Sequence, residues 1–228
     1  MKEEKSMALL SAKDRKQIQV RLAEMEQPVR LVHFTQELNC DSCEPTQRLL
    51  EEVAALSDKL TLEVYNFVLE REEAARFGID KVPATVVANE KDHGIRLYGL
   101  PAGYEFAVLL EDILDVSRGR TGLAVETRER LQTLARPVHL QVFVTPTCPY
   151  CPAAAWLAHQ LALESDLVTA DMIEATEYTD LVMRYGVQGV PKTIVNGVHA
   201  IDGALPEPYF VDQILQAANV AEAAGTGN

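Results

Sequence analysis

One short motif occurs twice in register, and this repeat constrains the fold more than any other feature. The pairs Cys40–Cys43 and Cys148–Cys151 lie 108 residues apart, and each is followed, 40 residues after its second cysteine, by the proline of a Val-Pro pair, Pro83 or Pro191. Upstream of the cysteines the match continues at a spacing of 109, so the first copy has one extra residue, which we place within Glu37–Asn39. Self-similarity at a fixed spacing indicates repeated structural units. We interpret the chain as an internal duplication.

Hydrophobic periodicity predicts a leading helix and then the order β-α-β-α-β-β-α in each copy. In the first copy we expect elements at Ala12–Glu26, Val29–Phe34, Cys40–Leu56, Leu60–Phe67, Glu70–Phe77, Ala84–Ala88, Ile95–Tyr98 and Tyr104–Val116. In the second copy we expect them at Glu126–Leu134, His139–Val144, Pro152–Leu163, Asp166–Ile173, Glu177–Tyr185, Thr193–Val195, His199–Ile201 and Pro208–Ala218. This order predicts an α/β fold of two units, residues 1–118 and 119–228, each a mixed sheet flanked by helices. The polar stretch Ser117–Gly122 is the expected linker.

The charge balance limits the partners. With 21 basic and 34 acidic residues the net charge is -13, and such a surface repels nucleic acid and anionic membranes. The N-terminal stretch MKEEKSMALLSAKDRK lacks the apolar run of a signal peptide, and no stretch is apolar enough for a transmembrane helix. We therefore expect a cytoplasmic protein.

All four cysteines belong to the two pairs, so none remains for a long-range disulfide. In a reducing compartment such pairs indicate redox catalysis or metal binding. A four-cysteine zinc site is disfavoured because 104 residues separate the pairs and each pair lies in a different copy. Haem attachment is excluded because Glu44 and Pro152, rather than histidine, follow the pairs. We expect no metal and no cofactor.

Each pair stands where a predicted strand ends and a helix begins. The free N–H groups of a helix start favour negative charge, so a cysteine placed there has its thiol pKa lowered from about 8.5 and forms the reactive thiolate more readily. A second cysteine, separated from the first by two intervening residues, can resolve the resulting mixed disulfide. We expect Cys40 and Cys148 to attack, and Cys43 and Cys151 to resolve.

The two sites are expected to differ. Glu37, Asp41 and Glu44 surround Cys40, and their charges oppose a thiolate and raise its pKa. No acid neighbours Cys148, and Pro149 suits a first helical turn. Our hypothesis is that Cys148 is the more acidic nucleophile and that the sites differ in reduction potential.

The motifs NCDSCE and TCPYCP, the repeated Val-Pro and the segment GLPAGYEFAVLLEDILDVSRG together resemble the protein disulfide oxidoreductases of archaea and thermophilic bacteria. These are glutaredoxin-like proteins with tandem thioredoxin folds, and CPYC is also the glutaredoxin active-site sequence. The resemblance implies reduction, oxidation or isomerisation of protein disulfides in the cytosol, with electrons from a thioredoxin-reductase-like flavoprotein.

In this fold the Val-Pro peptide is expected to be cis and to lie against the cysteines, where its backbone edge pairs with an extended substrate. Pro83 and Pro191 are therefore expected to belong to the catalytic sites. The expected substrate-binding residues are Tyr150, Pro149, Val190 and Val82.

The position where thioredoxins carry a buried acid, six residues before the first cysteine, holds Phe34 or Val142. Deprotonation of the resolving thiol must then be assisted by another group.

A different function is also open. An electron-relay module between a flavoprotein and a peroxiredoxin-type partner would resemble the N-terminal domain of alkyl hydroperoxide reductase flavoproteins. That domain has two thioredoxin-like units but normally one Cys-x-x-Cys pair, so two intact pairs favour an autonomous enzyme.

Overall fold

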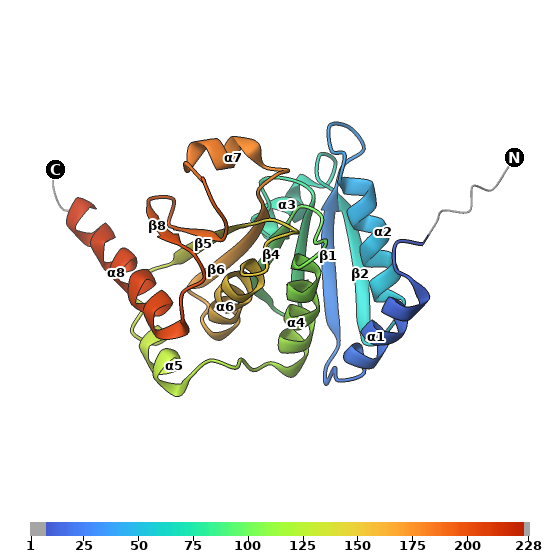
Figure 1. Ribbon diagram of the computed structural model, residues 1–228, viewed down its shortest axis with the longest axis horizontal. Helices are drawn as coiled ribbons and strands as arrows, with labels where there is room; N and C mark the ends of the chain where they lie inside the picture. The colour runs from blue at the N-terminus through green and yellow to red at the C-terminus, as the bar shows by residue number, and fades with distance from the viewer. Residues whose placement is uncertain (1–7, 226–228) are drawn as a thin grey trace, which may run out of the picture.

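Eight strands form one continuous mixed sheet in the computed structural model, which describes residues 8–225 (Figure 1). Residues 1–7, which carry much of the charged N-terminal stretch, lie outside the described residues. The strands follow the order β2-β1-β3-β4-β6-β5-β7-β8, so the first four in space come from the first copy and the last four from the second. Among the described residues, no helix is both long enough and apolar enough to cross a membrane.

The elements follow the predicted order in both halves. The first half contains α1 (Ala12–Leu22), β1 (Val29–Thr35), α2 (Cys43–Ala54), β2 (Leu60–Asn66), α3 (Arg71–Arg76), β3 (Ala84–Ala88), β4 (Asp92–Tyr98) and α4 (Glu105–Arg118). The second half contains α5 (Val125–Leu131), β5 (Val138–Val144), α6 (Cys151–Glu164), β6 (Val168–Glu174), α7 (Thr179–Arg184), β7 (Lys192–Val195), β8 (His199–Asp202) and α8 (Glu207–Gly225).

The two halves meet at a parallel pair of strands in the middle of the sheet. Strand β4 pairs with β6 from Ile95 opposite Ala170 to Tyr98 opposite Ile173. All four of these side chains are buried. The sequence predicted a sheet in each unit, and the structure fuses them into one. The predicted boundary between residues 118 and 119 falls at the end of α4 and remains a prediction.

Successive side chains along the strands point to opposite faces of the sheet, so the molecule has two hydrophobic cores. On one face Leu31 and Leu140 pack under α1, α2, α4, α6 and α8. On the other face Phe34 and Phe143 pack under α3 and α7. Helices α4 and α6 contact each other and lie side by side in the centre of the view (Figure 1). Strands buried on both faces require apolar residues at successive positions, which explains their rich content of Val, Ile and Leu.

Two predicted boundaries differ from the structure. The helix after the first cysteine pair begins at Cys43 rather than Cys40, because residues 41 and 42 form a turn. The predicted linker is wrong at its start, since α4 continues to Arg118. Ser117 is fully buried there, and its hydroxyl donates a hydrogen bond of 2.5 Å to the Gln27 carbonyl. Gly119 caps the C-terminal end of α4, and its φ of 61° suits a residue without a Cβ.

Candidate active sites at the two disulfides

Both Cys-x-x-Cys pairs form disulfides. In each pair the second cysteine is the first residue of a helix, α2 or α6, and the first cysteine lies in the turn that connects it to the preceding strand. Cys43 and Cys151 are 1% and 0% exposed, whereas Cys148 is 8% exposed and Cys40 is half-buried. The outer sulfur of the first pair is therefore the more open to an incoming disulfide.

At the second site the backbone surrounds Cys148. The N–H of Cys151 donates to Cys148 Sγ over 3.1 Å. The same sulfur lies 3.7 Å from the carbonyl oxygen of Val190, and the Val190–Pro191 bond is cis. The structure thus brings together the predicted residues Cys148, Cys151, Val190 and Pro191. Tyr150 is 72% exposed and Pro149 is also exposed, so both are on the surface of the motif.

The first site has a different hydrogen-bond pattern. Here the N–H of Cys43 donates to the carbonyl oxygen of Cys40, at 3.4 Å, rather than to its sulfur. The Val82–Pro83 bond is cis, so the expected cis geometry is confirmed in both halves. Val82 and Cys40 line a common groove of about 740 Å³. A hydrogen bond from an N–H stabilises a thiolate, and only the second site directs one at its outer sulfur.

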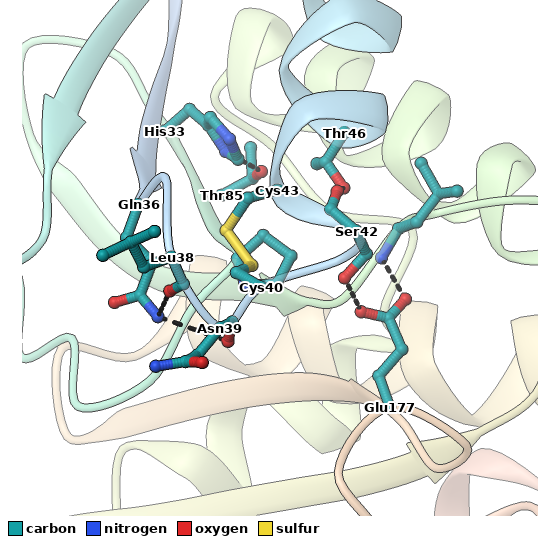
Figure 2. The surroundings of a disulfide bond; sticks show 12 residues. His33, Gln36, Leu38, Asn39, Cys40, Ser42, Cys43, Thr46, Thr85 and Glu177 are labelled. Atoms are coloured by element: carbon teal, nitrogen blue, oxygen red, sulfur yellow. Dashed lines mark hydrogen bonds between the residues drawn. A yellow bond between two sulfur atoms is a disulfide. The ribbon is translucent and has the colours of Figure 1, made fainter.

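Residues of the second half complete the first site (Figure 2). The hydroxyl of Ser42, inside the first motif, donates to Glu177 Oε2, and the backbone N–H of Leu100 donates to Glu177 Oε1 over 2.7 Å. The neighbouring hydroxyl of Tyr178 donates to the Pro83 carbonyl over 3.0 Å. Glu177 and Tyr178 both line the groove beside Cys40. These contacts could not be predicted from the sequence repeat, because they join residues of one copy to residues of the other.

Comparisons with known proteins agree with this geometry. The family model of the thioredoxin domain matches residues 138–216. The structure superposes on a protein disulfide oxidoreductase from Aeropyrum pernix K1 with a TM-score of 0.86 and 33% identity, covering 92% of this chain and 94% of that one. The chain belongs to the protein disulfide oxidoreductase family. The predicted family and its tandem thioredoxin-like architecture are confirmed, and two Cys-x-x-Cys disulfides in this fold are those of a thiol–disulfide oxidoreductase.

Single-unit and longer relatives also match. A thioredoxin from Methanocaldococcus jannaschii is 33% identical over 78 residues, which cover 34% of this chain and 92% of that protein. A component of the alkyl hydroperoxide reductase from Xanthomonas campestris pv. phaseoli is 26% identical over 149 residues, which cover 65% of this chain and 26% of that protein. Two further relatives are named NADH dehydrogenase. The matched part of this chain spans between a quarter and a third of the length of these two proteins and of the Xanthomonas protein.

Strand register identifies a site residue that counting along the sequence missed. His33 pairs with Thr85 as Val142 pairs with Thr193, so His33, rather than Phe34, is the counterpart of Val142 in the first half. The extra residue of the first copy causes this displacement. His33 is fully buried, its Nδ1 lies 3.1 Å from Thr85 Oγ1, and its Nε2 has no hydrogen-bond partner.

His33 lies close to the first disulfide (Figure 2). Burial lowers the pKa of its imidazole from 6.5 to about 4, against a smaller opposing effect of the Ala84 and Cys43 backbone. The ring is therefore neutral at neutral pH. A titratable group behind the first pair thus exists, but it is an imidazole and not an acid.

A second buried titratable group lies at the start of α4. Glu105 is 1% exposed and neither carboxyl oxygen has a hydrogen-bond partner. Burial, together with the charges of Glu174 and Glu177, raises its pKa from 4.5 to about 9. The preceding residue, Tyr104, contacts the loop of the second site: its backbone N–H donates to the carbonyl of Pro146 over 3.0 Å.

The four sulfurs are bonded in two pairs, each within its own motif. In the part of the chain that the structure describes, no group of three or more His, Cys, Asp or Glu side chains is arranged to hold a metal ion. The zinc alternative thus gains no support from this arrangement.

Proposed function

We propose that both disulfides exchange with disulfides of other proteins, Cys148 and Cys40 acting as nucleophiles and Cys151 and Cys43 as resolving thiols. The observation that carries this proposal is the placement of the second pair: Cys148 Sγ receives the Cys151 N–H and lies 3.7 Å from the carbonyl of Val190, just before cis Pro191. A substrate strand can use the same backbone edge. The similar Aeropyrum pernix protein is a protein disulfide oxidoreductase, which supports the same activity.

The exchange balances within the dithiol. In the reducing direction the Cys148 thiolate attacks one sulfur of the substrate disulfide, whose second sulfur leaves as a thiolate and takes a proton. The Cys151 thiolate then attacks Cys148 in the mixed disulfide. The substrate leaves with two thiols, and the enzyme keeps the Cys148–Cys151 disulfide, so two electrons and two protons have moved to the substrate. Oxidation is the same sequence reversed. In isomerisation another thiolate of the substrate attacks the mixed disulfide, so that a new substrate disulfide forms, Cys148 leaves as a thiolate and no net electrons are transferred.

The two sites have different roles in this proposal. Cys148 receives a helix-start N–H and has no acidic neighbour, so its thiolate is the better stabilised. Cys40 lacks that N–H and stands among carboxylates, although its sulfur is more exposed. Alkylation of single-site variants as a function of pH tests the difference. Cys148 is expected to react faster at pH 6, and faster reaction of Cys40 would contradict the proposal.

Turnover tests the function itself. We expect the wild-type chain, supplied with dithiothreitol, to reduce insulin and to restore activity to scrambled ribonuclease. Cys148→Ser is expected to lose most of both activities, and Cys40→Ser to retain part. Wild-type activity no greater than that of a variant with all four cysteines replaced would refute the proposed function.

An electron-relay role is the second candidate function. Its support is the match to a component of alkyl hydroperoxide reductase over 65% of this chain. In that role a flavoprotein reductase would reduce the dithiols and a peroxiredoxin-type protein would oxidise them. Rapid oxidation by a single peroxiredoxin, combined with weak insulin reduction, would favour the relay. In either role a thioredoxin-reductase-like flavoprotein is the proposed electron donor, and the cytoplasm is the proposed compartment on the basis of cysteine usage.

A further inference from the structure

The site at Cys40 lies beside two grooves that share this residue. One groove, of about 740 Å³, is lined by Ser42, Val82, Glu177 and Tyr178 among others. The other, of about 640 Å³, lies along the start of α2. Because Cys40 is half-buried and lines both, a substrate chain bound in either groove reaches the sulfur.

Acidic side chains outnumber basic ones in the lining of these two grooves. They are Glu37, Asp41, Glu44, Glu51 and Glu177. Within the lining that the structure describes, Arg48 is the one basic residue. Opposite charges brought together in a groove attract each other more strongly than in open water, because the surrounding protein has a low dielectric constant.

Glu177 differs from the other four carboxylates because it comes from the second half of the chain. Its two oxygens accept hydrogen bonds from Ser42 Oγ, inside the first motif, and from the Leu100 N–H. The adjacent Tyr178 is 7% exposed and its hydroxyl donates to the carbonyl of Pro83, the residue after Val82, which lines the groove. Both carboxyl oxygens of Glu177 are thus positioned beside the redox pair by hydrogen bonds.

The second site provides an internal comparison. No charged residue occurs from Thr145 to Ala155 around its cysteines, and the residue after Pro191 is Lys192. The net charge of the whole chain acts on both sites, whereas the carboxylate lining described above belongs to the first alone.

We infer that the Cys40–Cys43 site takes its substrate in a groove built by both halves of the chain and selects disulfides flanked by basic side chains, with Glu177 as a specificity-determining residue. This inference rests on the proposed function, since it assigns a substrate class to one of the two exchanging sites. The second site accepts disulfides with less regard to charge. The duplicated chain thereby serves two groups of substrates.

Single-turnover reduction of matched peptides tests the inference. Two single-site proteins are needed: an N-site protein carrying Cys148→Ser and Cys151→Ser, and a C-site protein carrying Cys40→Ser and Cys43→Ser. Each is pre-reduced, freed of reductant and mixed at pH 7 with one of two peptides. The peptides share one disulfide and differ only in four flanking residues, all Lys in one and all Glu in the other.

We expect the N-site protein to reduce the Lys peptide on the order of tenfold faster than the Glu peptide at low salt. The ratio should fall towards one in 0.5 M salt, which screens charges within a few ångströms. The C-site protein should show a clearly smaller ratio. An N-site ratio equal to or below the C-site ratio would overturn the inference.

Glu177→Gln in the N-site protein tests the local charge, since the amide keeps the shape of the side chain. We expect the Lys peptide to react several-fold more slowly and the Glu peptide to react faster, a pair of opposite changes that a purely structural defect would not produce. Glu126→Gln on α5 makes the same change in net charge at an exposed position outside the groove lining and is the matched control. Equal ratios in the two variants would remove Glu177 from the inference.

The outcomes separate this inference from the function on which it depends. If both single-site proteins reduce the peptides with the same charge preference, the function stands and the substrate class is wrong. If neither protein reduces either peptide, the proposed function fails and the inference fails with it.

Discussion

Two buried titratable side chains, His33 and Glu105, contribute to the pH dependence of the folded state in opposite directions. The folded chain keeps His33 neutral down to a pKa of about 4, whereas the unfolded chain protonates it near 6.5. The folded chain keeps Glu105 protonated up to a pKa of about 9, whereas the unfolded chain releases that proton near 4.5. Each difference makes the free energy of unfolding depend on pH over its own range.

For His33 we expect stability to fall as the pH falls. Between about pH 6.5 and pH 4 the unfolded chain binds one more proton than the folded chain at this residue, so acid favours unfolding by up to about 3 kcal/mol. Urea unfolding of the oxidised protein from pH 7 to pH 4 measures this. His33→Gln should have a slope of free energy against pH that is smaller by about one proton. Equal slopes in wild type and variant would show that His33 is not the group responsible.

For Glu105 the expected direction is reversed. The carboxyl favours the folded state below pH 4.5, and this advantage is lost as the pH rises through about 9. Glu105→Gln removes the titration, so at pH 8 it should raise the free energy of unfolding by up to about 5 kcal/mol relative to wild type, with little effect at pH 4. The comparison requires urea titrations at both pH values. A variant that is equally destabilised at pH 4 and pH 8 would indicate a packing defect instead.

At the scale of elements, the segment between β4 and α4 connects the two sites. Its first residues are held by Glu177, which also binds Ser42 of the first motif. Its last residues contact the second motif, where the Tyr104 N–H donates to Pro146. A Cβ on Gly103, whose φ is +55°, would lie 2.3 Å from the Pro146 carbonyl oxygen. This glycine is required by both backbone conformation and contact.

Gly103→Ala is therefore expected to cost about 2–4 kcal/mol of unfolding free energy and to slow reduction of insulin by the C-site protein. Gly119→Ala, at the other end of α4, is the matched control. Gly119 has a φ of +61°, and a Cβ there would meet nothing within 4 Å. That variant should cost only about 1 kcal/mol. Similar losses for the two variants would show that the contact with Pro146 has no energetic consequence.

For the whole molecule, the sequence predicts what lies within one copy and not what joins the copies. Spacing alone located both cysteine pairs and both prolines, because these positions repeat. The parallel pairing of β4 with β6 was not predictable, since Ile95–Tyr98 and Asp166–Ile173 each read as a buried strand without a specified neighbour. The contacts of Glu177 and Tyr178 with the first site depend on this pairing of β4 with β6, because both residues follow β6. His33 was missed because the extra residue in the first copy displaces a count along the chain.

Trapping of the mixed disulfide tests the central claim most directly. Cys151→Ser and Cys43→Ser, each with the other site replaced by serines, lack the resolving thiol and should accumulate a covalent adduct with a disulfide substrate. Counterpart variants that keep only Cys151 or only Cys43 are the controls, and mass spectrometry measures the fraction of each protein in the adduct. The predicted result is that the proteins keeping Cys148 or Cys40 form the adduct and their counterparts keeping Cys151 or Cys43 form little of it. Equal or greater adduct formation by the counterparts, or no adduct on Cys148 and Cys40, would contradict the account.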